Sequence, residues 1–215
     1  MTDKLSTTRL NDTLGRQKQT EDQDARLLEM LAICGSLREG SFNAALVRAL
    51  PALAPGSVTI TTSPSIGNLP HYDGDLEVAS GVPASALTLG GMVRNADAVI
   101  IVSPEYNTSI PGVLKNALDW LSRIGGAPLA GKPVLIKSVS PGPFGGTRMQ
   151  PHLRQVLSAM GAFVYPRPEV AVANAGQRFD EDGRLTDNPT RDLVRKQLAD
   201  FAAFAEKLVE RDEER

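Results

Sequence analysis

The chain contains one cysteine and two histidines, and this scarcity excludes several kinds of site. A single cysteine cannot form an internal disulfide or a CxxC redox pair, and alone it cannot hold an iron–sulfur cluster. Two histidines without an HExxH motif leave little for a catalytic metal, so we expect no metal site. Lys and Arg (23) nearly balance Asp and Glu (25), which argues against nucleic acid as a partner and against an acidic electron-carrier surface.

Long apolar runs are also missing. No run reaches the roughly 18 residues of a membrane span, and the N-terminus lacks a signal-peptide core, so we expect no membrane partner and a cytoplasmic protein. At 215 residues, with 41% hydrophobic and 22% charged residues, the chain suits one folded domain. Residues 1–26 carry five acidic and five basic side chains and few apolar ones. We therefore expect a flexible N-terminal arm before a domain over residues 27–210, with a strap on a partner subunit as the alternative.

Strand-like and helix-like patterns alternate along that domain. A continuous apolar run such as residues 98–102 is typical of a strand covered on both faces. Apolar residues spaced three and four apart over 111–124 predict an amphipathic helix. The alternation predicts a doubly wound α/β domain, a parallel sheet with helices on both faces. The predicted strands are 27–34, 57–62, 98–102, 133–139 and finally 162–165, and the predicted helices are 42–53, 83–95, 111–124, 148–160 and 188–208.

The loop after the first predicted strand has the composition of a phosphate site. Ligands of such sheets bind beyond the carboxyl ends of the strands, and here residues 35–43 read GSLREGSFN before a helix begins. Ser36, Ser41 and Asn43 offer short side-chain donors. Arg38 offers a cation, and the helix start offers free N–H groups, so the loop suits a phosphate monoester. The alternative is that Ser41 only caps the helix while Arg38 faces solvent.

The same loop excludes two common nucleotide sites. Gly35 and Gly40 have the spacing of a Walker A motif, but Ser41 stands where that motif requires lysine, so nucleotide hydrolysis is not indicated. The loop is not GxGxxG either, and it therefore does not predict a dinucleotide pyrophosphate over the helix start.

Three further segments follow predicted strands. Residues 103–111 form a polar run with one aromatic ring, Tyr106, against which a planar ligand could lie. Residues 140–148 contain the adjacent Gly145 and Gly146, whose amides could form a nest for an anion. Either segment could instead be an ordinary connecting loop. Residues 67–76 are expected to form a surface loop at the rim of the pocket.

Separated motifs in a fixed order resemble a known family. They are GSLREGSFN at 35–43, LPHYD at 69–73, PEYN at 104–107, PGVLKNALDW at 111–120 and GGTR at 145–148. Together they resemble the NADPH-dependent FMN reductases, a group that includes quinone and chromate reductases, over about residues 28–208. The resemblance implies a flavodoxin-like, five-stranded parallel sheet in the order 2-1-3-4-5 and a noncovalently bound FMN.

The resemblance also implies a set of site residues and a mechanism. NAD(P)H would pass a hydride to flavin N5 and leave, and a small-molecule electron acceptor such as a quinone or free flavin would follow it in a ping-pong scheme. Since the flavin carries this chemistry, we expect no catalytic side chain. The cofactor-binding residues expected are Ser36, Arg38, Ser41, Phe42 and Asn43 in the phosphate loop, and Pro104, Glu105, Tyr106, Asn107, Ser140, Gly142, Gly145 and Gly146 around the ring.

Other assignments remain open at this point. Tyr72, His71 and Arg148 are candidates for the substrate side, and Glu105 could be a proton donor or a turn carboxylate. The resemblance implies a homodimer or tetramer, with the helix around Trp120 near the subunit contact. The alternative function is a non-enzymatic electron carrier of the flavodoxin type, or an FMN-binding protein.

Overall fold

The structure is a computed structural model that describes residues 26–213. Most of the expected N-terminal arm, residues 1–25, therefore lies outside the described residues. The elements, in chain order, are β1 (Leu28–Cys34), α2 (Phe42–Ala49), η1 (Pro51–Leu53), β2 (Val58–Thr62), η2 (Ile66–Asn68), α3 (Gly74–Ser80), α4 (Ala84–Asn95), β3 (Ala98–Val102), α5 (Gly112–Leu121), β4 (Pro133–Val139), α6 (Met149–Ala159), β5 (Phe163–Val164), β6 (Val170–Val172), η3 (Ala175–Gln177) and α7 (Asn188–Glu213).

The sheet is parallel, and its strands lie in the order β2-β1-β3-β4-β5, which confirms the expected flavodoxin-like topology. The prediction that the last strand is 162–165 was wrong, because β6 also pairs with β4. β5 pairs with the first two residues of β4 and β6 pairs with residues 137–139, so two short strands share one edge position. Pro166 and Pro168 lie between them, and proline cannot donate to a sheet ladder.

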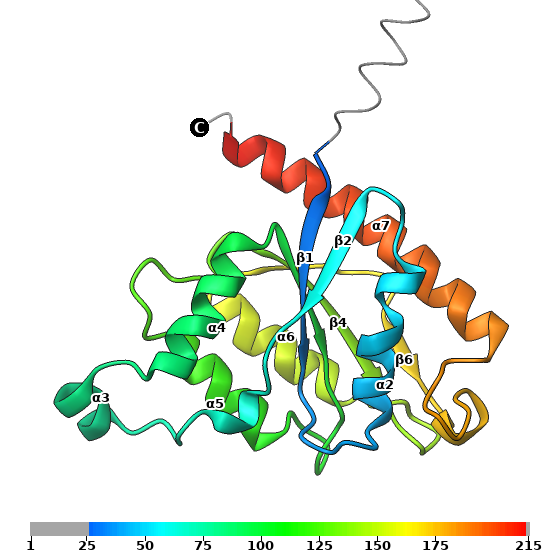
Figure 1. Cartoon of the computed structure of the whole chain (residues 1–215), viewed down its shortest axis with the longest axis horizontal. Helices are drawn as coiled ribbons and strands as arrows, with labels where there is room; N and C mark the ends of the chain where they lie inside the picture. Colours follow the sequence, from blue (N-terminus) through cyan, green and yellow to red (C-terminus); the bar gives the residue numbers. More distant parts are fainter. Residues whose placement is uncertain (1–25, 214–215) are drawn as a thin grey trace, which may run out of the picture.

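Two apolar layers cover the two faces of the sheet. Alternate residues of β3 face opposite layers: Ile100 packs with α2 and α7, whereas Val99 and Ile101 pack with α4, α5 and α6. Figure 1 shows α7 running across one side of the sheet, with α4 and α5 on the other. All five residues of β3 and all seven of β4 are buried, as expected for central strands covered on both faces.

The segment between β2 and α4 departs most from the sequence prediction. It contains η2 and α3 where a surface loop was predicted, and Figure 1 shows α3 projecting from the body of the domain. No residue of α3 is buried. The predicted helix 42–53 is also interrupted, since α2 ends before Pro51 and a short 3₁₀ turn follows.

We also searched residues 26–213 for membrane-spanning helices. No single helix there is long and apolar enough to cross a bilayer, and only α3 and α4 taken together, across a 92° bend, reach the required length and composition.

Candidate functional site

Three loops meet at the carboxyl edge of the sheet. They follow β1, β3 and β4, which are neighbours in the strand order. The chain leaves β1 for β2 on one side and returns to β3 on the other, so the order reverses between β1 and β3. That switch point is where α/β sheets of this kind bind ligands. The fold therefore places the three predicted loops side by side at the switch point, where sheets of this class form their ligand crevice. We call them the first loop (35–41), the second loop (103–111) and the third loop (140–148).

Exposure divides the predicted site residues into three groups. The exposed group comprises Arg38, His71, Tyr106, Asn107 and Arg148. The half-buried group comprises Ser36, Phe42, Tyr72, Pro104, Glu105, Ser140 and Gly142. The buried group comprises Ser41, Asn43, Gly145 and Gly146.

The first loop is fastened to the strands beside it. A Cβ at Gly35 would lie 2.4 Å from Oγ of Ser103, so glycine is required here by the close approach of β3. Ser41 caps α2, its Oγ accepting from the amide of Asn43 at 3.2 Å. The Asn43 side chain donates to the carbonyl of Val139 at 2.9 Å and accepts from its amide at 3.0 Å. Asn43 thus joins the first loop to the end of β4.

Arg38 is the free cation of this loop. Its side chain is exposed, and within residues 26–213 no carboxylate lies within ion-pair distance of it. Its amide donates to Oγ of the half-buried Ser36 at 3.4 Å. An unpaired guanidinium, two hydroxyl groups and the start of α2 form a donor set that fits the phosphate of FMN.

The second loop presents an aromatic ring on a tight turn. Tyr106 and Ser109 exchange two backbone hydrogen bonds of 3.0 Å, and Asn107 and Thr108 between them have φ angles of 48° and 64°. Two successive positive φ angles are those of a type I′ hairpin turn, and asparagine tolerates them well. Tyr106 is 46% exposed, which leaves its ring available to a planar ligand.

Glu105 and Arg148 join the second loop to the third. The Glu105 carboxylate accepts from the Arg148 amide at 3.0 Å and from Nε at 2.7 Å, and the guanidinium approaches it to 2.6 Å. The Glu105 side chain is only 9% exposed, whereas that of Arg148 is 56% exposed. The Arg148 guanidinium also lies 5.2 Å from the centre of the Phe144 ring. This arrangement makes Glu105 a structural carboxylate rather than a free acid.

Packing explains the paired glycines of the third loop. Gly145 has φ +61°, and a Cβ there would lie 2.7 Å from the carbonyl carbon of Ala171 in β6. Gly146 has φ +87°, and its Cβ would lie 2.9 Å from Cβ of Ser138. The amide of Gly142 donates to Oγ of Ser140 at 3.1 Å. Backbone geometry and close packing therefore require glycine at positions 145 and 146.

On the rim, Tyr72 is held on several sides. Its hydroxyl donates to Glu77 at 3.0 Å, and this hydrogen bond is the main cause that raises the pKa of the tyrosine. Its ring meets the Trp120 ring edge-on at 5.1 Å, and the Arg123 guanidinium lies 4.8 Å from its centre. Phe42, at the other side of the site, packs against Phe179 at 5.5 Å. Both side chains are anchored by the protein itself.

Sequence reasoning did not identify a buried polar group beneath the third loop. Lys137 in β4 is fully buried and donates to Oε1 of Gln197 in α7. Burial lowers its pKa from 10.5 to about 7. Nothing in the strand sequence PVLIKSV indicates that the lysine is buried and paired, because its partner lies 60 residues away. His152 contacts Oγ of Ser109 through Nδ1 at 3.0 Å.

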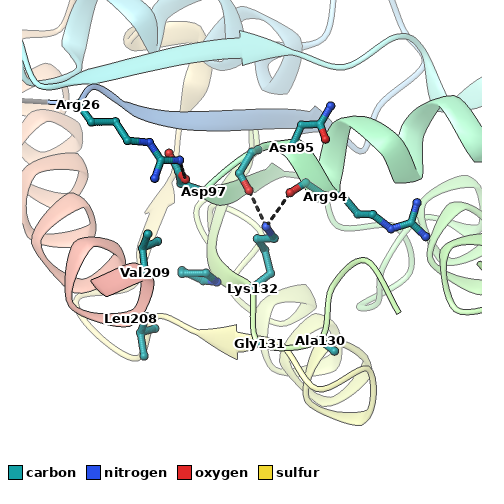
Figure 2. A pocket seen from close by; sticks show the side chains of 11 residues that line it. Arg26, Arg94, Asn95, Asp97, Ala130, Gly131, Lys132, Leu208 and Val209 are labelled. Carbon is teal, nitrogen blue, oxygen red and sulfur yellow. Dashed lines mark hydrogen bonds and ion pairs between the residues drawn. The ribbon is translucent and has the colours of Figure 1, made fainter. Parts of the chain in front are cut away.

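Two hollows share no residue with the first or third loop, although Ser109 and Ile110 of the second loop line one of them. One of about 340 Å³ is at the amino ends of the strands, where Lys132 donates to the carbonyls of Arg94 and Ala96 and Arg26 pairs with Asp97 (Figure 2). Those contacts close the end of α4, at the edge opposite the switch point. A groove of about 790 Å³ lies between α5 and α6. Among residues 26–213, no cluster of three His, Cys, Asp or Glu side chains could hold a metal ion.

Comparisons with known proteins agree with this geometry. A family model described as NADPH-dependent FMN reductase matches residues 28–177. The chain belongs to this family. A quinone reductase of Escherichia coli (strain K12) is 44% identical over 182 residues, which cover 84% of this chain and 97% of that protein. An NAD(P)H-dependent FMN reductase of Pseudomonas aeruginosa is 39% identical over 181 residues, covering 84% and 97%.

The fold comparison points the same way. The flavoenzyme NAD(P)H:(acceptor) oxidoreductase FerB of Paracoccus denitrificans superposes with a TM-score of 0.76 at 34% identity, over 84% of this chain and 98% of that one. Membership of the family confirms the expected enzyme class, with FMN as cofactor and NAD(P)H as co-substrate.

Proposed function

We propose that this protein uses FMN and NAD(P)H to reduce quinones, free flavin or similar small acceptors. The observation that carries the proposal is the crevice at the switch point, where Arg38 is unpaired beside the start of α2 and Tyr106 is exposed on the facing loop. The relatives named as quinone reductases, which align over most of this chain, support a quinone as acceptor. The proposal includes a cytoplasmic location.

In this proposal the site residues have two different tasks. Arg38, Ser36 and the α2 amides beside Ser41 bind the phosphate, and Pro104, Tyr106 and Asn107 lie along the ring. Asn43, Glu105 and Phe42 position those groups, because their own polar atoms or packing surfaces already have partners in the protein. The glycines of the third loop position it by allowing close packing on β6 and Ser138. Ser140 and Gly142 lie along the other edge of the ring.

The chemistry places few demands on the side chains. FMN, when bound, would supply the redox chemistry, which is hydride transfer from NAD(P)H followed by two-electron reduction of the acceptor. Glu105 is already bound by the guanidinium and amide of Arg148, so no side chain of the second loop has to serve as acid or base. The first, second and third loops would hold the ring, and the ping-pong scheme requires that one of its faces stay accessible. Donor and acceptor then occupy that face in turn, which is the ping-pong scheme.

Two measurements test the proposal. The purified protein is expected to show flavin absorbance and to oxidise NAD(P)H rapidly when menadione is added. Initial rates at several fixed quinone concentrations should give parallel double-reciprocal lines, whereas intersecting lines would contradict the shared face. A yellow protein that is inert with every quinone tested would favour the electron carrier instead.

We also propose self-association as a homodimer or tetramer through the groove between α5 and α6. Ile110, Leu118, Val156 and Met160 line it, which supports an apolar contact. Trp120 of α5 is fully buried in the core of its own subunit, so the helix, not this side chain, would lie at the contact. Light scattering during size-exclusion chromatography tests this, and a monomer at micromolar concentration would contradict it.

A further inference from the structure

A short stretch of the rim is fastened to α5 by three hydrogen bonds. Trp120 Nε1 donates to the carbonyl of Pro70 at 2.8 Å, and Asn116 Nδ2 donates to the same carbonyl at 2.9 Å. Asn116 Oδ1 accepts from the amide of Tyr72 at 2.7 Å. One amide side chain therefore binds the rim in both directions, and the buried indole adds a third bond. We call these contacts the rim clamp.

The rim segment spans the two sides of the candidate site. At one end, a Cβ at Gly67 would lie 2.8 Å from Cδ2 of Leu37, so the segment contacts the first loop. At the other end it is bound to α5, the helix that begins directly after the second loop. The stretch 67–72 therefore runs from the first loop to α5, and a shift of this stretch would change the surface beside both.

Besides the rim clamp, the buried Leu69 and the half-buried Tyr72 hold the far end of this segment against the core. α3 follows directly, has no buried residue, and contacts this end through the polar side chain of Glu77. The remaining contacts run through Tyr72, whose ring meets Trp120 and Arg123 and whose hydroxyl binds Glu77. Because Trp120 is fully buried and Asn116 lies on the same helix, the rim clamp ties a projecting segment to the rigid core.

We propose that Asn116 and Trp120 are positioning residues that hold Pro70–Tyr72 at the edge of the ring site and so determine the affinity for the electron acceptor. The inference rests on the proposed function. The chemical class concerned is a planar, quinone-like acceptor, which must enter beside the exposed His71 and the anchored Tyr72. FMN binding depends on the first loop, so it should not require the clamp.

Trp120 is the single tryptophan of the chain, so its indole reports on the clamp directly. In FMN-free protein, the indole N–H of the wild type should exchange slowly with solvent and be shielded from acrylamide. Asn116→Ala removes two of the three bonds and should raise indole exchange by about 5-fold or more, since the segment is then released more often. Exchange of the wild-type indole as fast as that of free tryptophan would overturn the clamp.

Kinetics of the FMN-loaded enzyme test the positioning role. Asn116→Ala should raise KM for menadione about 5-fold, while FMN affinity and the rate of flavin reduction by NAD(P)H in stopped flow stay within 2-fold. Ser122→Ala is the matched control, because it loses a side-chain bond to a backbone carbonyl of the same helix without touching the rim. The control should leave KM and indole exchange unchanged.

A second variant keeps the test decisive if Asn116→Ala folds poorly. Trp120→Phe removes the indole donor but retains an aromatic ring, and it should raise KM for menadione in the same direction. Unchanged KM in a folded, FMN-loaded variant would overturn the positioning role. Equal losses of FMN affinity, flavin reduction and acceptor affinity would overturn it as well, since they indicate general damage. If the proposed function is wrong, the wild-type protein will contain no FMN or show no activity. The indole exchange measurement does not depend on that result, because it uses FMN-free protein.

Discussion

The first and third loops of the site resemble each other in sequence and differ in what surrounds them. Each has glycines and one arginine near the start of a helix, two glycines in the first loop and three in the third. In the first loop Gly40 has nothing within 4 Å of its Cβ position, and Arg38 is exposed without an ion pair among the described residues. In the third loop Gly145 touches the backbone of β6, and Arg148 is bound to Glu105.

This difference distinguishes the first loop, which we propose binds the FMN phosphate, from the third loop, which we propose positions other groups of the site. A polar group contributes to ligand affinity when the folded protein leaves it without a partner, because binding then adds a hydrogen bond that folding did not already make. Arg38 meets that condition, whereas the amide, Nε and Nη2 of Arg148 already contact Glu105. The residue types alone do not distinguish the two cases.

The largest expected effect comes from adding one methyl group to the third loop. Gly145→Ala forces a left-handed residue and places Cβ 2.7 Å from a backbone carbon of Ala171, so we expect a loss of about 3 kcal/mol in the free energy of unfolding. Gly40→Ala is the matched control in the first loop and should change stability by less than about 0.5 kcal/mol. Urea unfolding followed by circular dichroism measures both. Equal stabilities of the two variants would remove the distinction between the loops.

The strands beneath the two loops differ as well. β1 ends in Cys34, whose pKa is raised chiefly by burial, whereas β4 carries the buried Lys137 with a pKa lowered to about 7. Between pH 7 and 10.5 the unfolded lysine holds a proton that the folded one has lost. Stability should therefore rise with pH across this window, and the full burial penalty is present below pH 7.

Lys137→Met should abolish that rise. Between pH 7 and pH 9 the free energy of unfolding of the wild type is expected to rise by about 2 kcal/mol relative to that of the variant. The slope can be at most about 1.4 kcal/mol per pH unit. Stopping at pH 9 limits the contribution of Cys34, which titrates above its ordinary value in the folded state. Lys207→Met, an exposed lysine of α7, is the control and should leave the pH profile unchanged. Parallel profiles for wild type and Lys137→Met would show that the lysine keeps its charge.

Local patterns predicted those parts of the fold that depend on local burial. Residues 98–102 are a continuous apolar run, and residues 133–139 begin with four apolar residues. Both segments are central strands with the predicted ends. β6 escaped prediction because Val170–Val172 is too short to show periodicity, and its pairing with Lys137–Val139 is a tertiary contact. The order of the strands came from the family resemblance.

Site residues were harder to assign, because their roles depend on distant partners. Asn43 has the chemistry of a phosphate ligand, yet its amide is bound to Val139, 96 residues away. Glu105 is a possible acid in sequence, but Arg148, 43 residues later, holds it. Asn116 and Pro70 show the same limit, since nothing in either motif indicates that they meet. Sequence supplies the candidate groups, and the fold decides which of them remain available to a ligand.

The smallest effect, and the sharpest test of the comparison, concerns the two arginines. Arg38→Ala should raise the dissociation constant of FMN about tenfold, which corresponds to one charge-assisted hydrogen bond at an exposed site. Arg148→Ala should weaken FMN binding less and lower stability by under about 1 kcal/mol, because its ion pair is half exposed. Fluorescence titration of FMN-free protein measures both constants.

Since exposed charges are screened by salt, raising the ionic strength should weaken FMN binding to the wild type and affect Arg38→Ala much less. Full FMN retention by Arg38→Ala on dilution would show that the phosphate cation lies elsewhere, and a larger loss in Arg148→Ala would reverse the tasks of the two loops.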